Sequence, residues 1–206
     1  YYDGLIRIDI LDFEKIHDFK AIQLVLELLR ERVGSSVSYS SIAYDVGISP
    51  NTVKKYIQIF ESLFIIFRVT PFSRNIARSI LKEPKIYFFD TGMVKGDEGV
   101  IFENLAALSF FKYVTGMIDN EGTAYKLHYL KTKEGKEVDF CLVKESAPIE
   151  IFEVKLSDSQ VSKNLIYFSE KYSIPAKQLV KYLKHEKKFS YGEIRNGITY
   201  LSQLEY

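Results

Sequence analysis

The sequence predicts a protein of the α/β (α+β) class that is built from two domains. In the first 92 residues, apolar residues recur mainly at helical spacing and two β-rich runs follow. Three helices followed by a hairpin are typical of a winged helix. After residue 92 the pattern becomes helix, three strands, helix and strand, which predicts an α/β sandwich with a mixed sheet. We therefore expect a winged helix-turn-helix over residues 1–92 and an α/β sandwich over residues 93–206.

Each helix of the first domain has a recognisable start. The first helix follows Asp18, which is a suitable N-cap, and the second fits residues 40–46. The third begins at Ser49 and has Pro50 in its first helical position, where a backbone N–H is not needed. The hairpin would be formed by residues 63–69 and 85–89.

The second domain begins where the spacing pattern of the apolar residues changes, near Gly92 to Gly99. Its long apolar segments are separated by polar turns rich in Lys, Glu, Gly and Pro. The expected elements are a helix over 100–114, strands over 126–130, 137–143 and 149–155, a helix over 158–172, and strands over 177–183 and 198–201.

The composition narrows the classes of function. The 28 basic and 27 acidic residues nearly cancel, so no global field would attract nucleic acid or an anionic membrane. No apolar run approaches the roughly 20 residues that a bilayer span requires, and the single cysteine excludes an internal disulfide. We expect a cytoplasmic protein without membrane contact. Because the sequence begins at Tyr1 rather than at a methionine and reads as the continuation of a chain, we expect a fragment of a longer protein.

Acidic side chains interrupt two apolar strands of the second domain. Alternation on the third expected strand places Ile151, Glu153 and Lys155 on one face, while Asp139 lies between apolar neighbours on the preceding strand. If these strands pair, Asp139 and Glu153 meet, and a divalent cation would relieve their repulsion. We expect Mg²⁺, or Mn²⁺, held by Asp139 and Glu153.

The neighbouring groups suit phosphodiester hydrolysis. Lys155 would stabilise developing negative charge or orient water, and Glu103 on the preceding helix would hold the attacking water or a second metal. The alternative is that Glu153 and Lys155 form an ordinary exposed ion pair, with Glu103 and Asp139 solvated. Cys141 has no nearby histidine signal and is expected to be a buried small side chain rather than a nucleophile.

Three segments resemble the helix glutamate, the strand aspartate and the Glu-x-Lys motif of the PD-(D/E)xK nuclease superfamily. They are Phe102-Glu103-Asn104-Leu105, Lys136-Glu137-Val138-Asp139-Phe140 and Phe152-Glu153-Val154-Lys155. The resemblance implies a PD-(D/E)xK nuclease-like domain over residues 93–206. Its expected catalytic set is Glu103, Asp139, Glu153 and Lys155.

A wider resemblance covers nearly the whole chain, from about residue 5 to 204. It includes Ile48-Ser49-Pro50-Asn51-Thr52-Val53-Lys54-Lys55-Tyr56 and Glu83-Pro84-Lys85-Ile86-Tyr87-Phe88-Phe89-Asp90-Thr91-Gly92. With the nuclease-like segments, these resemble the domain of unknown function that follows the ATP-binding module in a group of prokaryotic AAA-type ATPases. The sequence has no Gly-x-x-x-x-Gly-Lys-[Ser/Thr]. We therefore expect ATP binding only in the parent protein, whose ATPase domain would be a partner within the same chain.

Candidate DNA contacts lie in two places in the first domain. The early residues of the third helix would face a major groove, and the basic stretch from Arg68 to Lys85 would bind phosphate. The candidates are Asn51, Thr52, Lys54, Lys55, Arg74, Arg78 and Lys82. Acidic and basic residues balance over the first 99 positions, so the alternative is a packing module that joins the ATPase and nuclease-like domains.

These observations lead to two interpretations of the whole chain. The first is the C-terminal part of an AAA-type ATPase, with a DNA-binding winged helix and a metal-dependent deoxyribonuclease domain. The second is a non-catalytic, partner-binding or regulatory module of that ATPase with an inactive nuclease fold.

Overall fold

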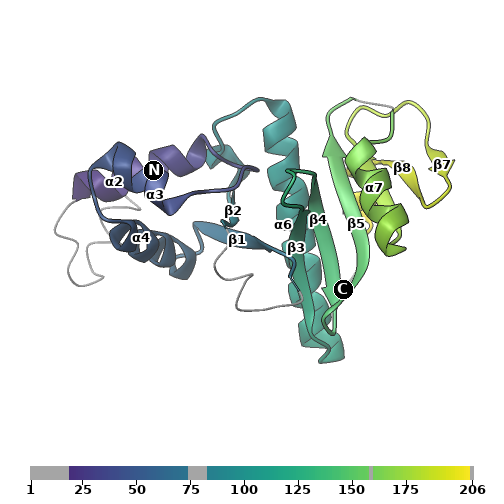
Figure 1. The fold of residues 1–206 in the computed structure, drawn as a ribbon, viewed down its shortest axis with the longest axis horizontal. Coiled ribbons are helices and arrows are strands. Elements are labelled where there is room, and N and C mark those ends of the chain that lie inside the picture. The colour runs from purple at the N-terminus through teal and green to yellow at the C-terminus, as the bar shows by residue number, and fades with distance from the viewer. Residues whose placement is uncertain (1–18, 74–82, 158–159, 205–206) are drawn as a thin grey trace. The chain divides into compact units, whose positions relative to one another are not determined.

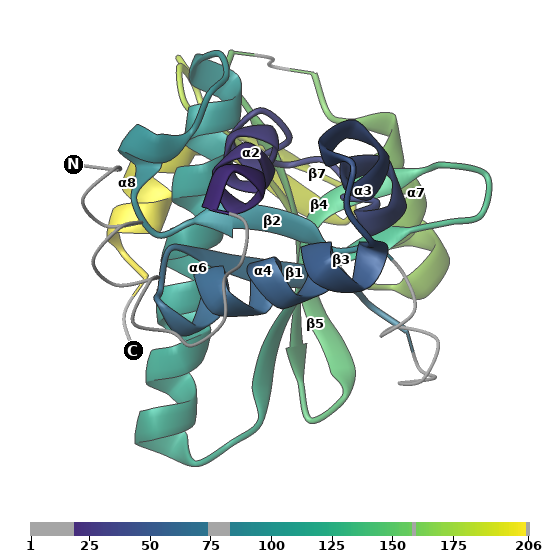
Figure 2. The same ribbon diagram turned by 90° about the vertical axis from the view of Figure 1, so that its left-hand side faces the viewer.

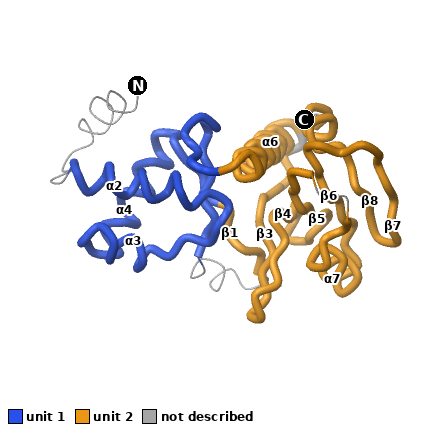
Figure 3. The backbone as a smooth tube through the Cα atoms, turned by 90° about the horizontal axis from the view of Figure 1, so that it is seen from above, with its two compact units in different colours: residues 1–68, 83–96 blue, residues 69–82, 97–206 orange. Residues whose placement is uncertain are grey.

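The computed structural model describes residues 19–73, 83–157 and 160–204 (Figure 1). The chain divides into two compact units (Figure 3). Unit 1 comprises residues 1–68 and 83–96, and unit 2 comprises residues 69–82 and 97–206. The division after residue 96 lies four positions beyond the expected domain boundary. Unit 2 also takes residues 69–82 from the first expected domain, because strand β1 (Ile66–Pro71) continues into it.

The helices of unit 1 are α2 (Phe19–Arg30), α3 (Tyr39–Val46) and α4 (Pro50–Ser62). Gly47 ends α3 in the left-handed conformation, with φ 78°, whereas α2 ends at Arg30, before Gly34. Ser49 caps α4, its hydroxyl accepting from the Thr52 N–H at 3.1 Å, and Pro50 takes the first helical position. The expected N-cap Asp18 lies outside the described residues.

Strand β2 (Lys85–Phe88) is the hydrogen-bonded neighbour of β1, and a short 3-10 helix, η1 (Thr91–Met93), follows it. The two strands lie where the hairpin was expected, although β1 begins three residues later and ends two residues later than predicted. Three helices and two strands are the parts of a winged helix, and that assignment stays a prediction.

Unit 2 contains the remaining helices and strands. They are α6 (Glu98–Glu121), β3 (Tyr125–Lys131), β4 (Glu137–Lys144), β5 (Ala147–Lys155), α7 (Lys163–Tyr172), β6 (Ala176–Val180), β7 (Lys187–Phe189), β8 (Gly192–Asn196) and α8 (Gly197–Ser202). Among the described residues, the strands form an eight-stranded sheet in the order β2-β1-β3-β4-β5-β6-β8-β7. The pairs β3–β4, β4–β5 and β7–β8 are antiparallel, whereas β1–β3, β5–β6 and β6–β8 are parallel. The predicted mixed sheet is thus confirmed.

Helices cover both faces of this sheet within unit 2 (Figures 1 and 2). On one face, Phe110 of α6 contacts Phe140 of β4 and Phe152 of β5, with ring centroids 5.4 and 4.5 Å apart. On the other face, Leu165 and Phe168 of α7 share a buried cluster with residues of β4, β5 and β6. Because adjacent residues of a strand face opposite sides, β4 and β5 contribute buried apolar side chains to both faces of the sheet.

Helix α7 begins at Lys163, so the predicted start at residue 158 was wrong. The buried Gln178 explains the difference. Its side-chain oxygen accepts from the Ser162 N–H and its amide nitrogen donates to the Gln160 carbonyl, both at 2.8 Å. These bonds hold residues 160–162 outside the helix, and the Ser162 hydroxyl then caps it.

The C-terminal segment also differs from the prediction. Residues 198–201 lie in the helix α8 rather than in a strand, because Asn196 acts as an N-cap and accepts from the Thr199 N–H at 3.0 Å. The strands β7 and β8 precede it and were not predicted. Helix α6 starts two residues earlier and ends seven residues later than expected, running from its N-cap Asp97 to Gly122.

None of the helices in the described residues combines the length and apolarity that crossing a bilayer needs.

Candidate functional site

Two carboxylates of unit 2, Asp139 and Glu153, come from the adjacent antiparallel strands β4 and β5. Phe140 pairs with Phe152 and Cys141 with Ile151; Asp139 precedes Phe140 on β4 and Glu153 follows Phe152 on β5, where the register of β4 with β3 is irregular. Asp139 Oδ2 accepts a hydrogen bond from the Val154 N–H at 2.9 Å. The carboxylate of Asp139 is therefore bound to the strand that carries Glu153. The short connection between the strands, Glu145 and Ser146, allows this pairing, since both residues have positive φ as in a tight hairpin turn.

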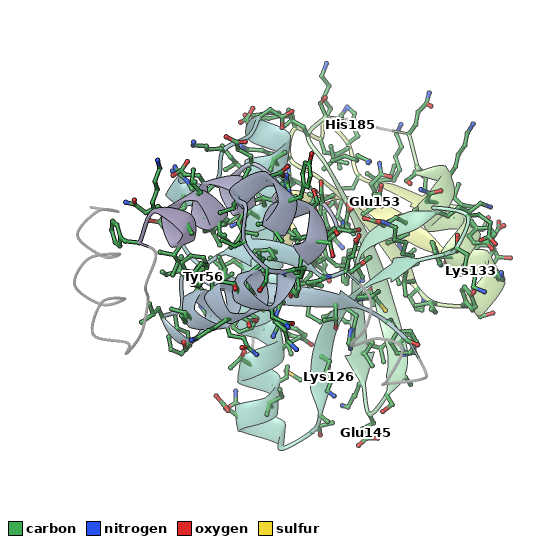
Figure 4. The ribbon with its side chains drawn as sticks, turned by 60° about the vertical axis from the view of Figure 1, so that its left-hand side comes forward. Tyr56, Lys126, Lys133, Glu145, Glu153 and His185 are labelled. Carbon is green, nitrogen blue, oxygen red and sulfur yellow. The ribbon has the colours of Figure 1, made fainter. Side chains whose placement is uncertain are left out.

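Glu153 and Lys155 form an ion pair on β5. Lys155 Nζ lies 2.9 Å from Glu153 Oε1, and the two side chains are 40% and 7% exposed, respectively. They share one side of the strand, as the alternation predicted. Because Glu153 is buried, the pair differs from the ordinary exposed ion pair that was the alternative. Glu153 is labelled in Figure 4.

The electrostatics of Lys155 link the helix α6 to the two strands. Burial acts to lower the pKa of Lys155, but the hydrogen bond with Glu153 and the negative charges of Glu153, Asp139 and Glu103 outweigh it. The pKa of Lys155 is therefore raised. The half-buried Glu103 comes from the first turns of α6. Negative charges from α6, β4 and β5 thus act together on the ammonium of Lys155.

The donor set limits the kind of metal site that could form here. The described parts of the chain contain no group of three or more His, Cys, Asp or Glu side chains arranged to hold a metal ion. Asp139 and Glu153 supply two carboxylates from adjacent strands. Mg²⁺ is commonly bound through one or two carboxylates together with waters and substrate phosphate. The residues fit such an open site and do not form a complete protein cage.

The candidate DNA-contact residues have different surroundings. Asn51, Lys54 and Lys55 are exposed on α4, whereas Thr52 is half-buried and its hydroxyl lies 2.8 Å from the Ser49 hydroxyl at the start of the helix. The remaining candidates Arg74, Arg78 and Lys82 lie outside the described residues.

Arg68 and Lys85, the two ends of the expected basic stretch, offer a smaller phosphate-binding surface than the sequence suggested. Arg68 donates to Glu61 at 2.7 Å and to the hydroxyl of Tyr39 at 3.4 Å. Lys85 is 1% exposed. Lys85 therefore offers no surface charge to phosphate, and the charge of Arg68 is compensated within unit 1. The positive charge that these two residues were expected to offer to phosphate is correspondingly reduced.

Two other side chains of unit 2 have clear structural roles. Cys141 is fully buried, and burial raises the pKa of its thiol to about 12, so it is not an available nucleophile. His128 Nδ1 lies 3.1 Å from the carbonyl oxygen of Thr70 and 3.2 Å from its hydroxyl. It joins β3 to the end of β1 rather than to a metal site.

Sequence reasoning missed a pocket in unit 2. It lies between the turn after β3 and the C-terminal half of α7, away from the residues discussed above. Tyr167 and Lys171, spaced by four on α7, were the available signal, because residues at this spacing share one face of a helix.

Comparison with known families divides the chain at the same point as the boundary after residue 96, although it keeps residues 69–82 in the first part. Residues 1–96 match a domain of unknown function (DUF8612), and residues 98–203 match a domain of unknown function (DUF4143). DUF4143 is a known C-terminal domain of AAA-type ATPases. No curated protein and no solved structure matched the chain. Since the second match covers more than half of its residues, the chain belongs to the DUF4143 family.

Proposed function

We propose that this chain is the C-terminal part of an AAA-type ATPase, and that its DUF4143 domain is a metal-dependent nuclease of the PD-(D/E)xK type. The observation that carries the proposal is that Asp139 is hydrogen-bonded to the strand that carries Glu153, where Glu153 forms an ion pair with Lys155. Isolated buried charges are costly, and carboxylates gathered around one cation are typical of sites that serve chemistry.

The groups have separate roles in cleaving a phosphodiester bond. Asp139 and Glu153 would hold Mg²⁺ or Mn²⁺, and the bound ion would supply Lewis-acid stabilisation of charge on the phosphate. The pKa of Lys155 is raised, so this side chain stays protonated at neutral pH and stabilises negative charge instead of acting as a base. Glu103 would orient a water molecule or accept its proton.

In the same proposal, unit 1 binds duplex DNA as a winged helix. The exposed Asn51 on α4 would reach base edges, and the exposed Lys54 and Lys55 would contact phosphates. Thr52 is engaged at the start of α4 and would contribute less than the sequence suggested. The packing role that competes with DNA binding predicts no loss of DNA affinity when Lys54 and Lys55 are neutralised together.

A second candidate is a non-catalytic module of the ATPase. It is favoured by the ion pair of Glu153, whose carboxylate already has a cation at 2.9 Å, and by the two-carboxylate donor set. In this case the nuclease-like fold would recognise a partner without cutting it.

Metal binding and cleavage distinguish the two candidates. The chain would be titrated with Mn²⁺ by calorimetry and incubated with plasmid, single-stranded and branched DNA in Mg²⁺ or Mn²⁺. We expect Asp139→Asn to remove Mn²⁺ binding and to lower cleavage by roughly 100-fold or more. An asparagine can still accept from the Val154 N–H, which preserves the link between the strands.

Asp119→Asn, an exposed position at the far end of α6, is the matched control and should leave cleavage unchanged. Chelation with EDTA should abolish cleavage. If the unaltered chain neither binds Mn²⁺ nor cuts any of these DNAs, the non-catalytic candidate replaces the nuclease.

A further inference from the structure

Unit 2 contains a pocket of about 660 Å³ that none of Glu103, Asp139, Glu153 or Lys155 lines. It lies between the turn that follows β3 and the C-terminal half of α7. Figure 4 labels both Lys133, which lines the pocket, and Glu153, and the two lie apart. The pocket is therefore separate from the carboxylate site.

One wall of the pocket is an aromatic surface on α7. Tyr172 is 50% exposed, and its ring is stacked with that of Phe168, with centroids 6.1 Å apart and planes at 22°. Tyr167 stands next to Phe168 in an edge-to-face contact at 5.3 Å. Because Phe168 is buried and supports Tyr172, the exposed part of the Tyr172 ring is a fixed, flat platform. Such a platform suits stacking with another flat ring.

Positive charge surrounds this platform. Lys131, Lys133 and Lys171 line the pocket against one carboxylate, Glu134, so the lining carries a net charge of +2. Lys131 is 2.9 Å from Glu137, which leaves Lys133 and Lys171 as the main sources of the positive field.

Lys171 is also held in place. Its Nζ donates to the Tyr167 hydroxyl at 2.8 Å and lies 5.4 Å from the centroid of the Tyr172 ring. On the rim, Lys136 Nζ sits 3.5 Å from the centroid of Tyr167. Ammonium groups thus lie beside the aromatic wall.

These features favour a ligand that combines a flat ring with an anionic group. Inorganic phosphate would use the lysines and leave the aromatic wall in water, while a neutral aromatic compound would gain nothing from the ammonium groups. A base joined through a sugar to a phosphate uses both, and the volume lies within the usual range for a small-molecule pocket. We propose that this pocket binds a nucleoside phosphate, with the base stacked on Tyr172 and the phosphate against Lys133 and Lys171. The inference does not rest on the nuclease proposal.

The test is a calorimetric titration of the 206-residue chain in EDTA, so that metal-dependent binding at Asp139 and Glu153 does not contribute. The probes are AMP, adenosine, inorganic phosphate, a single-stranded tetranucleotide of dA and a tetraglutamate peptide. We expect AMP to bind more tightly than adenosine or phosphate. Tyr172→Ala should weaken AMP binding roughly tenfold, as expected for one lost stacking contact, and Tyr172→Phe should preserve it.

Matched variants remove the same side chains elsewhere. Tyr191→Ala replaces another tyrosine that is 50% exposed, and Lys163→Gln replaces an exposed lysine at the opposite end of α7. Neither should change AMP affinity, whereas Lys171→Gln should lower it. If the tetranucleotide binds more tightly than AMP with the same dependence on Tyr172, the pocket serves a nucleic-acid strand. Equal affinities assign it to a free nucleotide, and both results support the proposal.

The proposal is overturned if AMP binds no better than phosphate or adenosine, or if Tyr172→Ala acts no more strongly than Tyr191→Ala. It is also overturned if the tetraglutamate peptide binds more tightly than AMP, because the lysines would then recognise an acidic protein. Since Tyr172→Phe keeps the ring and its packing on Phe168, loss of binding through misfolding is separated from loss of stacking.

Discussion

Glu153 illustrates the free-energy cost of burying one charged side chain in this fold. Its side chain is 7% exposed on β5, and a carboxylate in that position requires compensation of several kcal/mol from nearby positive charge and hydrogen bonds. An apolar residue would fill the same place at lower cost. Under the proposed function, this carboxylate would contribute by holding a metal ion.

Part of this site could be predicted from residues alone. Alternation along β5 correctly placed Glu153 and Lys155 on one side, and the antiparallel pairing of β4 with β5 brought Asp139 close. The burial of Glu153 and the charge of Glu103 beside Lys155 depend on how α6 lies against the strands. Sequence spacing contains no such information, because Glu103 is distant from the strand residues along the chain.

His128 gives the protein a pH-dependent stability at the level of one side chain. Burial lowers the pKa of His128 below its usual value of 6.5, with the charge of Lys126 acting in the same direction and the hydrogen bond to Thr70 opposing it. Well above pH 6.5 the ring is neutral in both folded and unfolded chains. Below it, the unfolded chain binds the proton more readily, so stability falls as the pH drops.

We therefore expect the free energy of unfolding in urea to decrease between about pH 7.5 and about pH 5.5, by at most about 1.4 kcal/mol per pH unit from this group. His128→Asn should show a smaller decrease, and His185→Asn, which replaces an exposed ring, should behave like the unaltered chain. Identical pH dependence in His128→Asn and the unaltered chain would contradict this role.

At the scale of elements, local signals decided which helices could be predicted. The start and stop of α3 and the start of α4 follow from Ser, Pro and Gly at their ends, and these residues act on their own backbone. The start of α7 could not be predicted, because Gln178 of β6 fixes the preceding residues from a distance of 16 positions. The strand predicted over residues 198–201 failed because its β-branched residues were outweighed by the cap at Asn196.

The pairing of β6 with β8 depends on a glycine. Gly192 lies opposite Ala176 in this parallel pair, and a Cβ at Gly192 would overlap the carbonyl oxygen of Ala176. The backbone of β6 cannot move away without breaking the ladder. Gly192→Ala should therefore lower the free energy of unfolding by roughly 3 kcal/mol, near the upper end of overpacking effects.

Gly122→Ala provides the comparison for that measurement. Gly122 has φ +65°, and no heavy atom lies within 4 Å of the position that a Cβ would occupy there. Its substitution therefore introduces only backbone strain, about 1 kcal/mol. Urea unfolding of both variants measures the difference. A smaller effect at Gly192 than at Gly122 would show that β6 and β8 are not held this closely.

On the scale of the whole molecule, the sequence indicated two parts, and the fold has two compact units. Their composition could not be predicted, because residues 69–82 belong to unit 2 although both flanking segments lie in unit 1. Each unit has its own buried apolar residues, including Ile57 in unit 1 and Ile151 in unit 2, both 0% exposed.

If the units open separately, a core substitution should act mainly within its own unit. We expect Ile57→Ala to reduce hydrogen-exchange protection in unit 1 and Ile151→Ala to reduce it in unit 2, each by about 2–5 kcal/mol of local opening energy. Amide exchange followed by mass spectrometry makes the comparison. Equal loss throughout the chain in both variants would indicate one cooperative molecule.

The single cysteine of the sequence, Cys141, offers a way to measure how often unit 2 opens. Cys141 is sealed in the interior of unit 2, with a thiol whose pKa is raised to about 12, so an alkylating reagent cannot reach or activate it in the folded chain. Each alkylated molecule records one opening event around the β4–β5 pair. The rate at which alkylation adds mass would report how often β4 and β5 separate, in the unaltered protein and without an attached probe.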